Sequence, residues 1–176
     1  AVTIRSRDPV MIEGLTIRWE RATSEDAREP QAATMLRDAT ATIRQCRVEA
    51  PGGNTRCPAG VHATGFTDLK IEASDVRGFE YAIDFWGGAK GAVTDCTIVK
   101  PGHCGITVGN DSEAEVANNV IVDSESAGLD ARDTCRLCAT GNVIVANARG
   151  MVVFKESGTN RNQLDGNLLW ENKTET

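Results

Sequence analysis

Short stretches in which apolar and polar residues alternate recur along the whole chain. A small residue opens each stretch, at Ala1, Ala32, Gly60, Ala82, Gly105, Gly128 and Gly150. The openings are 31, 28, 22, 23, 23 and 22 residues apart, so a repeat of about 22 residues is longer only in its first two units. Such alternation is typical of strands with one buried face. The pattern predicts a solenoid with loop insertions near residues 20–31 and 50–58.

Two further columns of aliphatic residues keep the same register. The first comprises Ile12, Ile43, Ile71, Val93, Val116, Ala139 and Leu164. The second comprises Ile17, Val48, Val76, Ile98, Ile121, Ile144 and Leu169. We therefore expect two strands and room for a third in each coil, stacked on the next coil about 4.8 Å away. The predicted fold is an all-β parallel β-helix of about seven coils, forming a single domain over residues 1–176.

A third column predicts a turn with an inward side chain in every coil. It comprises Leu15, Cys46, Ser74, Cys96, Asn119, Asn142 and Asn167. A buried amide needs hydrogen-bond partners, and amides on consecutive coils can bond one another and the turn backbone. The alternative is that the asparagines lie in exposed turns.

The repeat units resemble a known architecture. Residues 105–127 (GITVGNDSEAEVANNVIVDSESA) and 128–149 (GLDARDTCRLCATGNVIVANAR) are similar to units of the right-handed parallel β-helix repeat proteins, which include pectate lyase-like enzymes and polygalacturonases. The resemblance covers nearly the whole chain and implies a right-handed coil. It also implies a groove for an extended polysaccharide along the outer face of the first strand of each coil. One fold hosts many functions, so the activity must be argued from the residues.

Composition and charge limit the partners. The net charge is -6, with a pI of about 5.0, which argues against nucleic acid or an anionic membrane surface as a partner. No apolar run approaches the length of a membrane span. No capping helix is recognisable at either end of the solenoid, so we expect end-to-end self-association or further domains of a longer chain. Two N-x-S/T sequons and six cysteines favour an extracellular, periplasmic or cell-surface location.

The cysteines divide by register. Cys46 and Cys96 occupy the turn column two coils apart, too far for a mutual disulfide, and are expected to be buried thiols. Cys135 and Cys138 form a C-x-x-C that is compatible with a local disulfide, free thiols or a metal site. A bridge between Cys46 and Cys57 is a further option. The pairing, Cys104 included, stays open.

The outer face of the first strand is the place to seek function. The residues two after each opening are Thr3, Thr34, His62, Asp84, Thr107, Asp130 and Val152. The residues four after it are Arg5, Leu36, Thr64, Trp86, Gly109, Arg132 and Phe154. Ionisable and aromatic groups thus line the middle of the face.

Two enzymatic reactions could use this face. A uronate lyase or epimerase needs a base and a cation beside the substrate carboxylate, and Arg132 and Lys155 lie on successive coils. A glycoside hydrolase, the less favoured option, would pair Asp84 and Asp130 across about 9.6 Å, at the upper limit for an inverting pair. The polygalacturonase motif is only echoed at residues 102–106 (GHCGI), and its adjacent aspartate pair is missing.

Calcium is the cofactor that lyase chemistry would call for. Oxygen-bearing side chains are expected to converge near one turn, at Asn110, Asp111 and Asp133, with Glu113 and Asp130 close by.

A non-catalytic module is the competing hypothesis. Trp86 stands next to two glycines and can present a flat ring to a sugar, with His62, Thr107 and Phe154 widening the platform. A structural rod, as in an adhesin or a tail fibre, is a third option. The sequence favours a protein that interacts with polysaccharide through this face.

Overall fold

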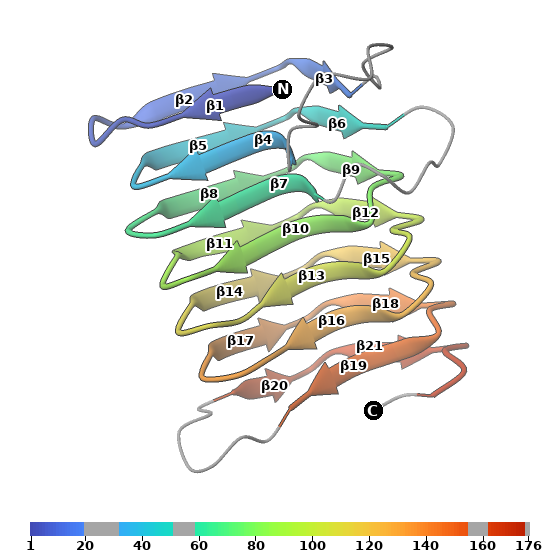
Figure 1. Ribbon diagram of the computed structural model, residues 1–176. Coiled ribbons are helices and arrows are strands. Elements are labelled where there is room, and N and C mark those ends of the chain that lie inside the picture. The colour runs from blue at the N-terminus through green and yellow to red at the C-terminus, as the bar shows by residue number, and fades with distance from the viewer. Residues whose placement is uncertain (20–31, 51–58, 155–161, 175–176) are drawn as a thin grey trace, which may run out of the picture.

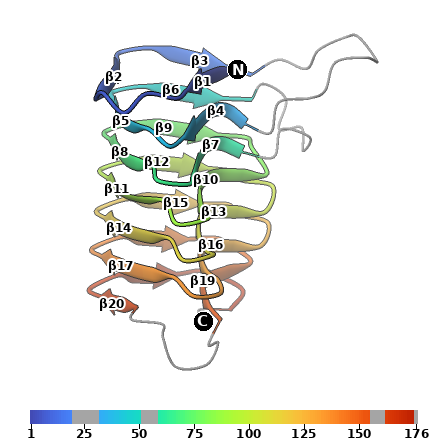
Figure 2. The same ribbon diagram turned by 60° about the vertical axis from the view of Figure 1, so that its left-hand side comes forward.

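The computed structural model describes residues 1–19, 32–50, 59–154 and 162–174. The chain winds into stacked coils, with the N-terminal coil at one end of the stack and the C-terminal coil at the other (Figures 1 and 2). Each coil contributes one strand to each of three parallel sheets, and each sheet has seven strands. The predicted parallel β-helix of about seven coils is therefore confirmed, including the third strand of each coil. Among the described residues, no helix is long and apolar enough to cross a membrane.

The three sheets differ in the position of their strands within the coil. The first sheet contains β1 (Val2–Ile4), β4 (Ala32–Arg37), β7 (Ala59–Thr64), β10 (Tyr81–Trp86), β13 (Cys104–Val108), β16 (Ala127–Ala131) and β19 (Arg149–Val153). The second contains β2 (Val10–Glu13), β5 (Thr40–Arg44), β8 (Asp68–Glu72), β11 (Lys90–Thr94), β14 (Glu113–Ala117), β17 (Arg136–Thr140) and β20 (Gln163–Asp165). The third contains β3 (Thr16–Arg18), β6 (Arg47–Glu49), β9 (Asp75–Arg77), β12 (Thr97–Val99), β15 (Val120–Val122), β18 (Val143–Val145) and β21 (Leu168–Trp170).

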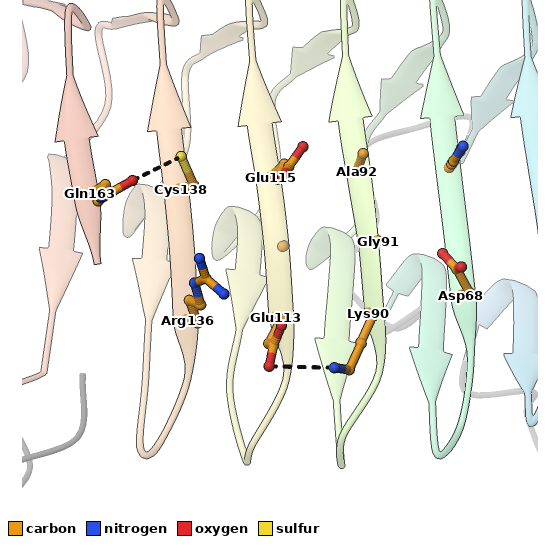
Figure 3. A pocket seen from close by; sticks show the side chains of 11 residues that line it. Asp68, Lys90, Gly91, Ala92, Glu113, Glu115, Arg136, Cys138 and Gln163 are labelled. Atoms are coloured by element: carbon orange, nitrogen blue, oxygen red, sulfur yellow. Dashed lines mark hydrogen bonds and ion pairs between the residues drawn. The ribbon is translucent and has the colours of Figure 1, made fainter. Parts of the chain in front are cut away.

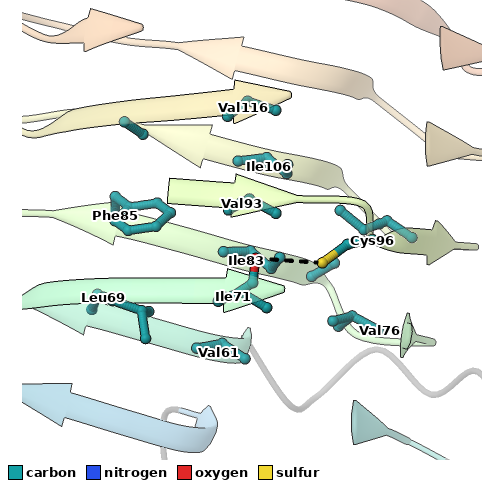
Figure 4. Packing of buried hydrophobic residues seen from close by; sticks show 14 of the residues in the cluster. Val61, Leu69, Ile71, Val76, Ile83, Phe85, Val93, Cys96, Ile106 and Val116 are labelled. Atoms are coloured by element: carbon teal, nitrogen blue, oxygen red, sulfur yellow. Dashed lines mark hydrogen bonds between the residues drawn. The ribbon is translucent and has the colours of Figure 1, made fainter. Parts of the chain in front are cut away.

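Aliphatic side chains of equivalent positions stack in files inside the coil. Ile83 pairs in register with Ile106, which pairs with Leu129, which pairs with Met151, so these residues form one file as predicted. The aliphatic columns of the second and third sheets also pair residue for residue. Figure 4 shows residues from all three sheets meeting in this interior, among them Phe85, Val93 and Val76. A long, narrow core runs through the stack, and every coil extends it.

The opening residue of each coil is small because the strand bends there. Ala82 and Ile83 are consecutive and both buried, so two successive residues face the interior at this corner. At Gly128, an added Cβ would lie 2.5 Å from Ile144 Cγ2 and 2.8 Å from the carbonyl oxygen of Gly150. The opening column is thus restricted to glycine and alanine by the third strand of the same coil.

The second coil corrects one detail of the predicted register. Met35 pairs with His62, and Thr34 pairs with Val61, so this coil opens at Ala33 and not at Ala32. A shift of one residue exchanges the two faces of a strand. Thr34 and Leu36, which were expected to face outward, are therefore completely buried, and Met35 and Arg37 take their outward places. The insertions predicted near residues 20–31 and 50–58 fall almost wholly outside the described residues and stay a prediction.

An asparagine ladder joins successive coils at the turn between the second and third sheets. The residue before each ladder position has a positive φ, as at Asn118 (58°) and Gly141 (65°), and this turns the next side chain inward. Asn142 Oδ1 accepts from the Asn119 backbone N–H at 2.9 Å and from Asn119 Nδ2 at 3.0 Å. Asn142 Nδ2 donates to the Val116 carbonyl at 2.8 Å and to Asn167 Oδ1 at 2.8 Å. The predicted inward amides are confirmed.

A second ladder, which the sequence pattern did not reveal, lies at the turn after the third sheet. The backbone N–H of Ser124 donates to Asn147 Oδ1 at 2.8 Å, and that of Asn147 donates to Asn172 Oδ1 at 2.9 Å. The residues before them again have positive φ, as at Ala146 (58°). Two turns in these coils are therefore fixed by side-chain amides.

We expect Asn142→Ala to destabilise the protein by about 2–4 kcal/mol, because it leaves buried donors of Asn119 and the Val116 carbonyl without a partner. Denaturant unfolding followed by circular dichroism measures this. Asn142→Ser should lose less, since Ser74 fills the same column and both accepts from the Cys46 N–H and donates to the Glu72 carbonyl. Equal stability of Asn142→Ala and wild type would contradict the ladder.

Gly128→Ala should also destabilise the protein, by about 1–3 kcal/mol, since the new methyl group meets a buried side chain and a backbone oxygen. The matched control is Ala82→Gly in the same column, which creates no clash and costs about 1–2 kcal/mol through backbone entropy and the lost burial of one methyl group. Thermal unfolding of the two variants compares them. A Gly128→Ala protein as stable as wild type would show that the corner has room for a side chain.

Candidate functional site

The outer face of the first sheet carries a column of polar side chains across four successive coils. Its members, here called the polar row, are His62, Asp84, Thr107 and Asp130. Each is the register partner of the next, so neighbours are separated by one strand spacing of about 4.8 Å. Met35 precedes the row on β4 and Val152 follows it on β19. The structure thus brings together four side chains that the sequence had placed in one outward column.

His62 and Asp84 form a histidine–carboxylate pair at one end of the row. His62 Nδ1 lies 2.7 Å from Asp84 Oδ2, and the two side chains are 18% and 17% exposed. The carboxylate fixes the orientation of the ring and leaves Nε2 as the nitrogen that can exchange a proton with a ligand. This pairing is suited to proton transfer because the carboxylate orients an imidazole, which can accept or donate a proton.

Asp130, at the other end of the row, is almost completely buried. Arg132 Nε donates to Asp130 Oδ2 at 2.5 Å, and the Cys104 thiol donates to the same oxygen at 3.3 Å. Within the part of the chain that the structure describes, Asp130 Oδ1 has no hydrogen-bond partner. A buried oxygen without a donor is unfavourable, so a donor that reached Oδ1 would be bound with a gain in free energy.

The Cys104 thiol links Asp130 to a histidine. His103 Nδ1 lies 2.9 Å from Cys104 Sγ. Burial and the Asp130 carboxylate raise the pKa of the Cys104 thiol to about 12. At neutral pH the sulfur therefore carries its proton and acts as a hydrogen-bond donor. It does not act as a nucleophile, because only a thiolate is an effective nucleophile. Because its protonated thiol donates to Asp130 Oδ2, Cys104 is a positioning group for the Asp130 carboxylate.

Tyr81 and Arg132 complete this group of side chains. The Tyr81 ring lies 5.0 Å from that of His103, and burial raises the pKa of the Tyr81 phenol. The hydrogen bond to Asp130 raises the pKa of Arg132, so its guanidinium stays charged. Arg132 Cζ is 5.9 Å from the centre of the Phe154 ring, within the range of a cation–π contact. We call this group the acid–thiol cluster. Its members are Tyr81, His103, Cys104, Asp130 and Arg132.

Trp86 lies on the same strand as Asp84, two residues further along and on the same face of the sheet. It is half-buried and lies against Gly109 of the next coil, where any side chain would overlap the indole ring. Gly87 and Gly88, which follow it, both have positive φ and end the strand. The ring is thus held across the face of the sheet by the absence of a side chain at Gly109.

The structure separates two acidic residues that were expected close to the predicted calcium ligands. Among the described residues, no group of three or more histidine, cysteine or acidic side chains converges on one point. Glu113 begins a strand of the second sheet and pairs with Lys90 at 3.4 Å, while Asp130 is engaged by Arg132 on the first sheet. Asp111 accepts a hydrogen bond from Thr134 in the turn. Glu113 and Asp130 therefore lie on different sheets, and the calcium site at Asn110, Asp111 and Asp133 stays a prediction.

Two catalytic pairs were predicted, Arg132 with Lys155 and Asp84 with Asp130, and the structure describes both residues of the second pair only. Lys155, proposed as the partner of Arg132, lies outside the described residues. Asp84 and Asp130 do share a column, but Thr107 stands between them and each carboxylate is bonded to its own neighbour. The hydrolase pair therefore consists of two separately engaged carboxylates.

The five described cysteines are free thiols. Cys135 and Cys138 are not bridged, so the local disulfide option is not realised. Cys46 and Cys96 are buried in the turn column as predicted, and burial raises the pKa of the Cys96 thiol to about 11. Cys57 lies outside the described residues.

A hollow of about 380 Å³ lies on the outer face of the second sheet (Figure 3). The small residues Gly91 and Ala92 line it. Charged residues of alternating sign follow one another in register along it, at Asp68, Lys90, Glu113 and Arg136. Neighbouring charges of opposite sign neutralise one another, so this hollow offers little to select a ligand. The first sheet is the better candidate.

Tyr81, His103 and Cys104 are site residues that the outward columns missed. Tyr81 and Cys104 each stand one place before an opening residue, and the bend at that residue makes this position face outward. The two consecutive inward residues after it, such as Ala82 and Ile83, are the sequence signal that could have indicated the bend.

Comparison with known proteins agrees with the fold. A family model described as a right handed beta helix region matches residues 31–175. No curated protein and no solved structure gives a significant match. The resemblance to pectate lyase-like enzymes is consistent with the fold and stays a prediction. Since the family model spans well over half of the 176 residues, the chain belongs to the right-handed β-helix family.

Proposed function

We propose that the protein binds an extended polysaccharide across the outer face of the first sheet. The observation that carries the proposal is the polar row itself, which runs through four coils without interruption and is flanked by rings. From β7 to β16 the row spans about 14 Å, or three strand spacings. A ligand that uses the whole row must itself be long and repetitive.

The chemistry of the face suits a sugar chain. The partly exposed His62 imidazole and Asp84 carboxylate can exchange hydrogen bonds with sugar hydroxyls, while Thr107 and Asp130 are buried beneath the surface of the row. The ring of Trp86, half-buried and held against Gly109, offers an apolar surface to the C–H face of a sugar. Apolar rings with a few fixed polar groups are the usual make-up of a small-molecule site. Extracellular, periplasmic or cell-surface location is proposed with this function, since such polymers occur there.

A non-catalytic module would use this face for binding alone. A purely structural rod would have no need for a largely buried His62–Asp84 pair or for a buried carboxylate held by Arg132. Buried charged groups are costly to maintain, so their presence on an outer face favours a ligand-binding role over a merely structural one.

One observation favours a reaction as a second candidate function. The His62–Asp84 pair is accessible and oriented, as a general base must be. In a uronate chain, His62 Nε2 would take the proton from the carbon next to the carboxylate, and the C–H electron pair would form the enolate. An epimerase returns a proton to the opposite face of that carbon. A lyase instead expels the β-oxygen, which takes up a proton, and leaves an unsaturated sugar.

The binding proposal predicts that Trp86→Ala weakens retention of the polysaccharide at least ten-fold, since the ring contact is lost. Affinity electrophoresis against pectate, alginate and neutral glycans identifies the ligand, and calorimetry with its oligomers measures the change. Trp170→Ala is the matched control, because Trp170 is 60% exposed on the outer face of the third sheet. Loss of binding in the control alone, or no binding of wild type to any glycan, would overturn the proposal.

The second candidate predicts that wild type incorporates deuterium from D2O into a bound uronate oligomer or releases an unsaturated product. His62→Gln should abolish both and leave the dissociation constant within a few-fold, because the base is removed and the other contacts remain. Mass spectrometry measures the incorporated deuterium, and ultraviolet absorbance measures the unsaturated product. Binding by wild type without exchange or cleavage would leave the protein as a binding module.

A further inference from the structure

Charged side chains on the outside of the coils alternate in sign from one coil to the next. Arg44 bonds Glu13 of the preceding coil at 2.5 Å, and Glu72 follows in the same column. Arg18 bonds Glu49 at 2.8 Å, and Arg77 follows. Opposite charges in register stabilise a parallel stack, whereas like charges are repelled. The outer columns of the second and third sheets thus keep charge neutral along the rod.

Arg5 and Arg37 are the exception among the strand columns that the structure describes. Arg37 ends β4, and Arg5 follows β1, so the register that pairs Ile4 with Leu36 places the two arginines side by side on the first sheet. Their coils are about 4.8 Å apart, and no acidic side chain lies between them in the column. Asp38 is the nearest acidic partner of Arg37, at a loose 3.9 Å. Two adjacent positive charges therefore remain largely uncompensated.

Both arginines line one open groove of about 380 Å³. We call it the arginine groove. Its lining residues are Arg5, Met35, Arg37, Asp38, His62, Thr64, Gly65 and Gly87. His62 belongs also to the polar row, so the groove opens onto the proposed glycan surface. The Arg37 side chain is 62% exposed and free to reorient toward a ligand.

We infer that the arginine groove binds an anionic substituent, a carboxylate or a sulfate, on the polysaccharide that occupies the polar row. The inference rests on the proposed function of this face and goes beyond it, because the polar row alone does not fix the charge of the glycan. A guanidinium offers paired N–H donors that match the two oxygens of such a group. An anion between two arginines would restore the alternation of charge found on the other columns.

The shared His62 gives the groove a second role. In register, Thr64 lies between Arg37 and Trp86, and His62 lies between Met35 and Asp84, so a chain anchored by its anion at Arg5 and Arg37 reaches Trp86 over Thr64 with His62 beside it. The groove therefore sets both the charge preference of the site and the direction in which the chain lies along the sheet.

The test compares two ligands that differ only in charge, an oligogalacturonate and its methyl ester. Calorimetry with wild type should show at least ten-fold tighter binding of the charged oligomer, and added NaCl should weaken only that binding. Arg37→Gln should remove most of the difference and leave the ester unchanged. Arg5→Gln gives a second variant of the same kind. The matched control is Arg77→Gln, an exposed arginine on the third sheet, which should leave both affinities unchanged.

Each alternative result is distinguishable. If neither oligomer nor any other glycan binds, the proposed function itself fails. If both oligomers bind equally to wild type, or if Arg37→Gln weakens both equally, the glycan surface stands and the arginine groove is not its anion site. Sodium sulfate titrated alone separates the sources: saturable binding of free sulfate that is lost in Arg37→Gln, with no charge preference among glycans, would make the groove a site for a free oxyanion and overturn the inference.

Discussion

The rest of this structure depends on one constraint, which is that equivalent residues of successive coils stack in register. Each coil can bury its aliphatic residues only against the same positions of the coils above and below it. One displaced coil would expose an entire file. The asparagine ladders reinforce this, because Asn142 bonds the backbone and the side chain of Asn119 on one side and Asn167 on the other. The interior therefore specifies the geometry of the coil and leaves the outer positions free to vary.

The candidate functional residues occupy those outer positions, and the fold brings residues from successive repeats next to one another there. Residues about 22 positions apart become neighbours about 4.8 Å apart, which is how His62 meets Asp84 and how Cys104 meets Asp130. The second and third sheets use their outer columns for ion pairs that stabilise the stack. The first sheet instead holds a histidine–carboxylate pair, a buried acid bonded to an arginine and an uncompensated arginine pair, which together suit a long, charged ligand.

The interior could be predicted from the sequence and the details of the outer face only in part. Repetition of Ile83, Ile106 and Leu129 fixes which residues stack, because a 22-residue period admits one arrangement. The shift at Met35 could not be foreseen, since Ala32 and Ala33 are equally small. Tyr81 and Cys104 were missed because a bend interrupts simple alternation. The position of Glu113 on the second sheet beside Lys90 could not be foreseen either, because the distance along the chain does not show which sheet a strand joins.

A crystal structure of the protein with a bound oligogalacturonate tests the central claim most directly. The account predicts density for the sugar chain along β7, β10, β13 and β16, with a ring over Trp86 and a carboxylate between Arg5 and Arg37. Oligosaccharide bound instead on the outer face of the second or third sheet, with the polar row bare, would contradict it.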